Sequence, residues 1–284
     1  MIDRLCIVGT GLIGGSLARD LRRLGKVGEI VGSSRHAANL KRAVALGVID
    51  RFDVDAARAV IGADVVVVAV PLGAVRAVFE RIRDTVDDDA VITDVGSAKG
   101  SVVAAARAVL GPRLARFVPT HPVAGTEHSG VDSSIERLFE HRRVIVTPIP
   151  ETDTDAFDRV SAMWKAVGSE VLEMDVAHHD QVLAATSHLP HMLAYTLVDV
   201  LGRMEERSEI FRYSAGGLRD FTRVASSDPQ MWHDICTANR GPIVDALERF
   251  GAGLDRLTEA VRRGDGEYVR SIFARAKAIR NEYS

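Results

Sequence analysis

Three histidines in two short motifs are the side chains best suited to move a proton near neutral pH. His121 precedes Pro122, which disfavours a helical backbone at His121 and keeps it extended. His188 and His191 flank Pro190 in a helical stretch, where the proline removes a backbone hydrogen bond and predicts a kink beside two imidazoles on one face. A structural loop histidine is the alternative interpretation of His121. A zinc site would need further ligands, so no metal is expected.

A serine and two arginines add a hydroxyl and cations to these imidazoles. Ser97 follows an apolar stretch, where it could contact a ligand or only cap the next helix, and Ser101 complicates this choice. Arg219 and Arg223 lie in the segment 216–229, whose glycines permit close approach, and this pattern suits an anionic substrate. Either arginine alone could instead be an ion-paired helix residue.

The segment Gly9-Thr10-Gly11-Leu12-Ile13-Gly14 follows an apolar run and opens a helical pattern, an arrangement that binds dinucleotide phosphates. The first glycine permits the tight turn, the second lets a pyrophosphate approach the backbone, and the third lets the helix pack on the sheet. The helix N-terminus adds unpaired N–H groups and the positive end of the dipole. A glycine turn without a ligand is the alternative. The expected cofactor contacts are Gly9, Gly11, Leu12, Ile13, Gly14, Pro71 and Ser97.

The end of the second predicted strand indicates which dinucleotide is bound. An NAD-binding protein would place Asp or Glu there to bind the ribose hydroxyls. This chain has Ser33, Ser34 and Arg35, two hydroxyls and a guanidinium that can hold a 2′-phosphate. We therefore predict NADP as the cofactor, with NAD as the second choice. The alternative is that the serines only cap a helix beginning near Arg35.

Short runs rich in Val and Ile alternate with helical patterns up to about residue 149, which is typical of βα units, and one more helix and strand follow up to residue 174. Most runs are nearly all apolar, as strands covered on both faces must be. The predicted strands are 5–8, 29–32, 65–70, 90–94, 116–119, 143–147 and 170–174, with a helix at 153–167. We predict an α/β Rossmann-type domain over residues 1–174, with a doubly wound, mostly parallel sheet. The carboxyl ends of its strands bring the glycine loop, Pro71, Ser97 and His121 to one edge.

Residues 175–284 have apolar side chains at helical spacing and no convincing strand. Leu193 and Leu197 illustrate this spacing, and amphipathic helices are predicted at 243–262 and 268–283. We predict an all-α second domain here. At roughly 150 residues per domain, a chain of 284 residues suits two domains.

The composition excludes several classes of protein. Lys and Arg total 36 against 39 Asp and Glu, a net charge of -3, so no broad positive field is present to bind nucleic acid. No apolar run approaches the roughly 18 residues of a membrane span, and the N-terminus lacks an apolar signal segment. We expect a cytoplasmic protein without a membrane partner. Cys6 and Cys236 suit reduced, packed thiols better than a disulfide.

Five motifs in one order along the chain resemble the prephenate and arogenate dehydrogenase family of tyrosine biosynthesis. They are GTGLIGGS at 9–16, DVGS at 94–97, HPVAGTE at 121–127, SHLPH at 187–191 and the segment 216–229. The match spans nearly the whole chain, and the last three motifs are more specific than the glycine loop. The resemblance implies a nucleotide-binding domain and an all-α C-terminal dimerisation domain that forms a homodimer. It also implies oxidative decarboxylation of prephenate or arogenate to 4-hydroxyphenylpyruvate or tyrosine.

The same resemblance implies roles for individual residues. His121 corresponds to the catalytic histidine that hydrogen-bonds the substrate C4 hydroxyl, and Ser97 to the serine near that hydroxyl. Arg223 is similar to the arginine that binds a substrate carboxylate, with His191 as a polar partner. Glu127 falls where an acidic residue is associated with the amino group of arogenate, and the other substrate-binding candidates are Trp232 and His188. The chain begins at its first predicted strand and ends after its last helix, so neither a chorismate mutase nor a C-terminal regulatory domain is expected.

Two other functions fit parts of this pattern. A β-hydroxyacid-type dehydrogenase shares the glycine loop and a helical second domain, but it is expected to use a lysine at the interface. The chain has no lysine between Lys165 and Lys277, which argues against that class. A non-catalytic NADP-binding redox sensor fits the fold equally well, but it would not need His121, His191 and Arg223 together.

Overall fold

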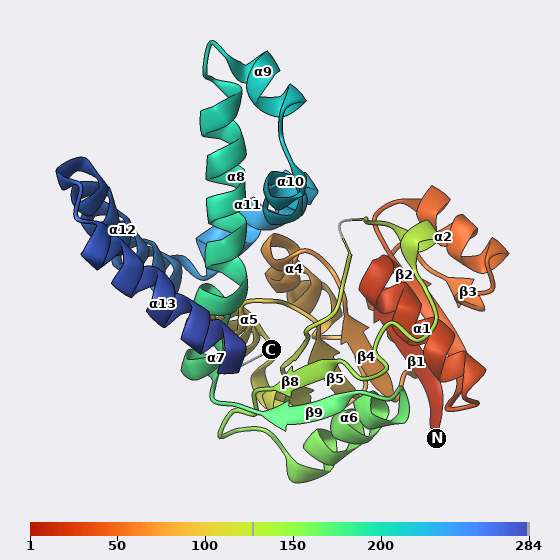
Figure 1. Ribbon diagram of the computed structural model, residues 1–284. Coiled ribbons are helices and arrows are strands. Elements are labelled where there is room, and N and C mark those ends of the chain that lie inside the picture. Colours follow the sequence, from red (N-terminus) through yellow and green to blue (C-terminus); the bar gives the residue numbers. More distant parts are fainter. Residues whose placement is uncertain (127, 283–284) are drawn as a thin grey trace. The chain divides into compact units, whose positions relative to one another are not determined.

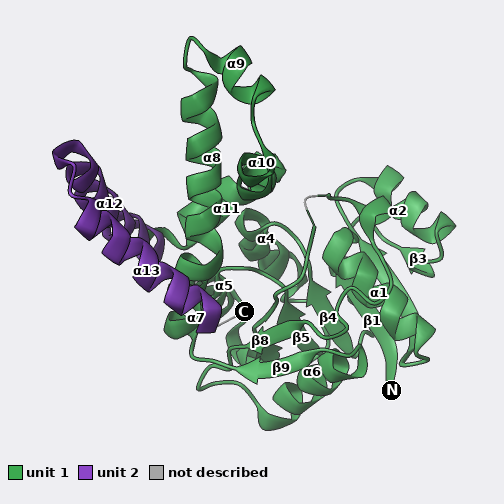
Figure 2. Cartoon of the chain, viewed as in Figure 1, with its two compact units in different colours: residues 1–240 green, residues 241–284 purple. Residues whose placement is uncertain are grey.

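The computed structural model describes residues 1–126 and 128–282, and the chain divides into two compact units, residues 1–240 and 241–284 (Figure 2). The boundary predicted between residues 174 and 175 lies inside the first unit and stays a prediction. Within the described ranges, no helix is both long enough and apolar enough to cross a membrane.

The first unit contains a parallel sheet of six strands in the order β3-β2-β1-β4-β5-β6 (Figure 1). These strands are β1 (Ile2–Val8), β2 (Val27–Ser33), β3 (Arg51–Phe52), β4 (Val65–Val68), β5 (Val91–Asp94) and β6 (Phe117–Val118). The strand order reverses between β1 and β4, and ligands bind beyond the carboxyl ends of strands at such a reversal. The expected site therefore lies where the glycine loop follows β1.

Helices cover both faces of this sheet, as the apolar strands require. One face packs against α1 (Leu12–Arg23), α2 (Ala37–Ala45) and α6 (Thr154–Ala166), and the other against α3 (Ala56–Ala59), α4 (Leu72–Ile82) and α5 (Lys99–Val109). In β4, Val65 and Val67 enter the first core while Val66 and Val68 enter the second. The predicted Rossmann-type, doubly wound domain is confirmed.

A single sheet was predicted, but the strands after Val118 form a second, smaller sheet. A second sheet holds β7 (Thr120–Pro122), β8 (Arg143–Val146) and β9 (Glu170–Glu173), with β7 antiparallel to β8. The strand predicted at 116–119 stops at Val118, because Pro119 has no N–H to continue the ladder and the chain enters the second sheet. His121 therefore lies on a strand, opposite Ile145 of β8, rather than in a loop.

The rest of the first unit is helical. It comprises α7 (Val176–Leu183), a π-helical turn (Ala184–His188), α8 (Leu189–Gly202), α9 (Arg207–Arg212), α10 (Gly216–Thr222) and α11 (Pro229–Ala238). The kink predicted at Pro190 stays a prediction, and a π-helical turn ends at His188, two residues before the proline. This turn carries His188.

The second unit is formed by α12, which starts at the end of the first unit, and α13. Helix α12 spans Arg240–Arg263 and α13 spans Gly266–Glu282, close to the predicted ranges. The two helices line a shared groove of about 330 Å³. Both helices also have exposed large apolar side chains, which are Val244, Leu247, Phe250, Leu254, Val261, Phe273 and Ile279.

Candidate active site

The glycine loop joins β1 to α1, and its three glycines have different roles. Gly9 has a φ of 105°, and a Cβ there would lie 2.1 Å from the carbonyl oxygen of Ala69. A Cβ on Gly14 would lie 2.3 Å from the carbonyl oxygen of Gly9, so only glycine lets α1 approach this closely. A Cβ on Gly11 would meet no described atom within 4 Å, and no described side chain caps α1. Open space beside uncapped helix amides fits the pyrophosphate of a dinucleotide.

The residues predicted to select the dinucleotide lie beside this loop. Ser33 ends β2, and its carbonyl oxygen accepts the N–H of Gly9 at 2.8 Å. The Ser34 hydroxyl accepts the backbone N–H of His36 at 3.2 Å, so it stabilises the turn before α2, and Arg35 is exposed. Pro71 is the residue that precedes α4, next to the carboxyl end of β4.

A fully buried ion pair lies at the carboxyl end of β5. Lys99 Nζ donates to Asp94 Oδ2 at 2.5 Å and to the carbonyl oxygen of Thr120 at 2.6 Å. Burial lowers the pKa of Lys99, and the Asp94 carboxylate opposes that effect. Asp94 also accepts the N–H of Gly96 at 2.7 Å, which fixes the turn that leads to Ser97. Sequence reasoning missed Lys99, although a carboxylate at a strand end five positions before a lysine was a usable signal.

His121 is held by a chain of side chains from α7. Its Nδ1 lies 2.9 Å from Nε2 of His179, and Nδ1 of His179 lies 2.8 Å from Oδ1 of Asp180. The Asp180 carboxylate also accepts the N–H groups of Lys99 and Gly100, at 2.7 and 2.8 Å, and so joins α7 to the N-terminus of α5. Sequence reasoning missed His179 and Asp180, whose only local signal is the His-Asp pair near the start of a helix.

The electrostatic surroundings keep His121 neutral at pH 7. Burial lowers its pKa well below the usual value, and the neighbouring groups His179, Lys99 and His188 lower it further. Since Nδ1 contacts His179, Nε2 is the nitrogen left for a ligand, and it has no hydrogen-bond partner among the residues described.

His188 and His191 flank the indole of Trp232. His191 stacks on the indole, with ring centroids 3.9 Å apart and planes at 25°, and His188 meets its edge at 6.1 Å. Burial lowers the pKa of His188 to about 4, and its ring also faces the backbone of Ser97. Asn239 Nδ2 donates to its Nδ1 at 3.1 Å, so the hydrogen is on Nε2. That Nε2 is buried, and the backbone of Ser97 is the group that it faces.

Arg223 belongs to a turn that packs against α8, the helix of His191. It begins a short 3-10 turn, Arg223–Ser226, and its side chain is exposed. Burial lowers the pKa of His191, and the positive charge of Arg223 lowers it further. Arg219, on α10, is also exposed. Glu127 lies outside the described residues.

Four of the predicted residues, His121, His188, His191 and Trp232, are linked by a series of contacts within the first unit. The connection from His121 to Arg223 runs through His179, Asp180, Asn239, His188, Trp232 and His191. Over residues 1–126 and 128–282, no group of three or more His, Cys, Asp or Glu side chains is placed to hold a metal ion. What the arrangement offers is a neutral imidazole base in His121 and a cation, Arg223, whose charge reaches His191.

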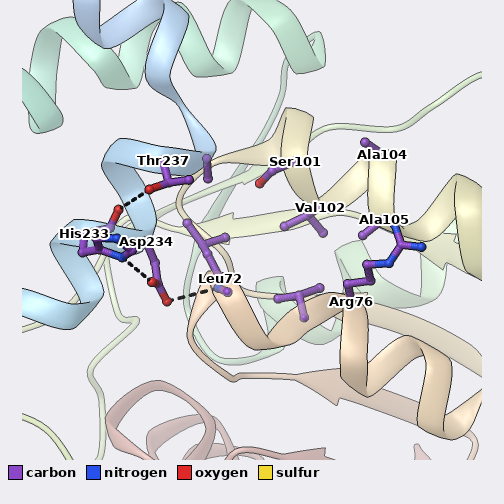
Figure 3. Close-up of a pocket in the computed structure, with 12 residues that line it drawn as sticks. Leu72, Arg76, Ser101, Val102, Ala104, Ala105, His233, Asp234 and Thr237 are labelled. Atoms are coloured by element: carbon purple, nitrogen blue, oxygen red, sulfur yellow. Dashed lines mark hydrogen bonds and ion pairs between the residues drawn. The ribbon is translucent and has the colours of Figure 1, made fainter.

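A pocket of about 570 Å³ lies between α4, α5 and α11 (Figure 3). It is mostly apolar on the side of α4 and α5, while α11 contributes His233 and Asp234. Asp234 Oδ2 accepts the N–H of Gly73 at 3.2 Å in the first turn of α4. This bond fastens α11 to α4 and so supports Trp232, which α11 also carries.

The chain is similar to known proteins over nearly its whole length. Residues 17–173 match the family described as "Prephenate dehydrogenase, nucleotide-binding domain", and residues 175–275 match "Prephenate dehydrogenase, dimerization domain". The chain is 36% identical over 284 residues to the cyclohexadienyl dehydrogenase of Zymomonas mobilis, covering 99% of this chain and 96% of that protein.

Two solved structures are similar over nearly the whole chain. One is the prephenate dehydrogenase of Aquifex aeolicus in complex with hydroxyphenyl propionate and NAD+, with a TM-score of 0.93 and 36% identity, covering 100% of this chain and 99% of that one. The other is the arogenate dehydrogenase of Synechocystis, with a TM-score of 0.82 and 25% identity, covering 99% and 100%.

Proposed function

Because the chain belongs to the prephenate dehydrogenase family, we propose that it catalyses the NADP-dependent oxidative decarboxylation of prephenate or arogenate. The products are 4-hydroxyphenylpyruvate or tyrosine, and NAD is the second choice of cofactor. One observation carries the proposal. The buried imidazole of His121 lies on β7, just after the carboxyl end of β6, and a series of contacts joins it to His188, Trp232 and His191, whose pKa the charge of Arg223 lowers.

The glycine loop and the end of β2 would hold the cofactor. The amides at the start of α1, beside Gly11, would bind the pyrophosphate, and Ser33, Ser34 and Arg35 would bind the 2′-phosphate. When bound, the oxidised nicotinamide supplies a two-electron oxidant for C4 of the substrate.

The residues from α7 to α11 and from β7 would act on the substrate. His121 Nε2 takes the proton of the C4 hydroxyl, and Ser97 orients that hydroxyl. Arg223 binds a substrate carboxylate, with His191, Trp232 and His188 around the ring. Aromatisation drives loss of the ring carboxylate as CO2, so the protein needs to supply only position and one base. Glu127 is the candidate partner for the amino group of arogenate.

A four-way assay of prephenate and arogenate against NADP and NAD tests the function and the cofactor choice. Absorbance of the reduced nicotinamide should rise with at least one substrate, with a higher specificity constant for NADP. Equal or NAD-favouring constants would overturn only the cofactor preference. Binding of NADP without turnover of either substrate would favour the redox sensor and overturn the proposed activity. Tyrosine, added last, shows whether the product inhibits.

Substitution of the proposed carboxylate-binding arginine tests the substrate site. Arg223→Ala should raise KM about thirtyfold or more, because losing the cationic partner of a bound carboxylate costs about 2 kcal/mol or more. Arg219→Ala is the matched control, since Arg219 is likewise an exposed arginine of the same segment. Unchanged KM in Arg223→Ala, or an equal rise in both variants, would contradict the role of Arg223.

We also infer a homodimer formed through the C-terminal helices. The match to a dimerisation domain and the exposed apolar side chains of α12 and α13, including Phe250 and Leu254, support it. Sedimentation should give twice the chain mass, and replacing Phe250 and Leu254 by Glu should shift it toward one chain. A wild-type protein sedimenting as a single chain would refute the dimer. The cytoplasmic location stays a prediction.

A further inference from the structure

We propose that His179 and Asp180 are positioning residues for His121. They hold the His121 imidazole in the tautomer with the lone pair on Nε2, and they take up the positive charge once Nε2 is protonated. This inference rests on the proposed function of His121 as the base. His179 and Asp180 lie on α7, and the proposed function assigns neither of them a contact with the substrate.

The hydrogen bonds around Asp180 fix the direction of the whole chain of side chains. Although burial raises the pKa of Asp180, hydrogen bonds from His179, Gly100 and Lys99 hold it below its usual value. The group is therefore a carboxylate, which only accepts, so His179 must donate from Nδ1. With Nδ1 donating to Asp180, we assign the acceptor role to Nε2 of His179, so that His121 donates from Nδ1. The lone pair of His121 is left on Nε2, where a base needs it.

Because His179 and Asp180 are buried, protein groups rather than water molecules determine how these side chains are hydrogen-bonded. His179 is 0% exposed and Asp180 is 7% exposed, and the imidazole rings of His121 and His179 meet edge to face, with centroids 5.1 Å apart. Asn239 Nδ2 donates to the carbonyl oxygen of Asp180 at 2.8 Å, which adds a further tie to α7. A fixed histidine between a carboxylate and a second imidazole orients the base in the way that Asp orients His in serine hydrolases.

The charges around His121 explain why a second imidazole is useful. Lys99 of α5, His188 of the π-helical turn and His179 of α7 all oppose a positive charge on His121, while Asp94 is engaged by Lys99. Asp180 is the carboxylate that reaches this chain of rings, and it contacts His179 rather than His121. Moving the positive charge from His121 to His179 therefore places it beside its counter-ion.

The proton movements balance without a route to solvent. The substrate O–H bond breaks as the His121 Nε2–H bond forms, and its electron pair becomes the second C4–O bond. In the same step the C4–H bond breaks, and its hydride would go to the two-electron oxidant that a bound nicotinamide supplies. The His121 Nδ1–H bond breaks as the His179 Nε2–H bond forms. When the C–CO2 bond breaks, its electrons aromatise the ring and leave a phenolate. The phenolate regains the proton as the two transfers reverse, so each turnover releases no proton from the buried pair.

Two substitutions of His179 separate its two roles, with His178→Phe as the matched control because His178 is the exposed neighbour. His179→Phe can neither accept from His121 nor hold a proton, so kcat should fall about 10²–10⁴-fold with nearly unchanged KM. His179→Gln can accept through its carbonyl oxygen and donate to Asp180, so it should keep the tautomer. It cannot take up the proton, and its kcat should lie between those of the wild type and His179→Phe.

Nitrogen-15 NMR of the ring nitrogens, in the intact protein saturated with NADP+, reads the tautomer independently of turnover. The His121 signals, identified by their loss in His121→Asn, should show hydrogen on Nδ1 and none on Nε2 in the wild type and in His179→Gln. Hydrogen on Nε2 in the wild type would overturn the proposal. So would wild-type kcat in His179→Phe or, should that variant not fold, wild-type kcat in His179→Gln. If the wild type turns over neither substrate, the proposed function fails, and the NMR result still decides the tautomer.

Discussion

Acidification from pH 7 to pH 5 should destabilise the folded chain through His188. This imidazole is 1% exposed, and burial lowers its pKa from 6.5 to about 4. Above pH 6.5 the ring is neutral in both the folded and the unfolded chain, so it contributes no pH dependence. Between pH 6.5 and 4 the unfolded chain binds a proton that the folded chain does not. The free energy of unfolding therefore falls as the pH falls through this window.

The size of the effect follows from the two pKa values. For a group that titrates at about 4 when folded and at 6.5 when unfolded, the free energy of unfolding should drop by about 2 kcal/mol between pH 7 and pH 5. The pKa of His121 is also lowered by burial, so its contribution has the same sign.

Urea unfolding at the two pH values, followed by tryptophan fluorescence, measures this drop in the wild type and in His188→Gln. The glutamine does not titrate, and its carbonyl oxygen can still accept from Asn239. The difference between the two proteins at pH 7 reports the lost contacts, whereas the change in that difference at pH 5 reports the proton. The pH-dependent loss should be about 2 kcal/mol smaller in the variant. Equal losses in both proteins would refute the assignment of the lowered pKa to His188.

Two further substitutions test the cofactor loop and the buried ion pair. Gly11→Ala should leave the melting temperature unchanged, because the added Cβ meets no described protein atom within 4 Å, yet calorimetry should show at least about tenfold weaker dinucleotide binding. Unchanged affinity would mean that the pyrophosphate does not lie there. Lys99→Met should lower the free energy of unfolding in urea by about 3–5 kcal/mol, because it leaves the Asp94 carboxylate buried without its partner. A loss below about 1 kcal/mol would show that the pair is not buried in solution, and adding Asp94→Asn should recover part of the loss.

The elements that could be predicted from the sequence have strong local signals. The valines of β4 are explained by burial on both faces of the sheet, and the glycines before α1 by the backbone conformation of the turn. Each of these constraints concerns only a few consecutive residues, so each leaves a local sequence signal. The two-residue strand β3 is too short to have a pattern. The switch to the second sheet after Pro119 depends on a missing backbone donor, which a hydrophobic pattern does not register.

The candidate site likewise contains residues that a local motif marks and residues that only the folded chain brings into place. Residues in motifs, such as His121 and His191, could be predicted because neighbouring prolines and the order of the motifs mark them. His179 could not, because its role depends on a contact with a ring 58 positions earlier in the chain. Lys99 was also missed: the carboxylate five positions earlier was a signal, but the carbonyl group of Thr120 that completes its surroundings is brought to it only by the fold.

The rate of nicotinamide reduction in a single turnover, at saturating prephenate or arogenate, is the most direct test of His121 as the base. His121→Asn should reduce this rate about 10²–10⁴-fold, the usual contribution of a positioned general base, while cofactor affinity stays nearly intact. A variant that reduces the cofactor as fast as the wild type would contradict the proposed chemistry at its centre.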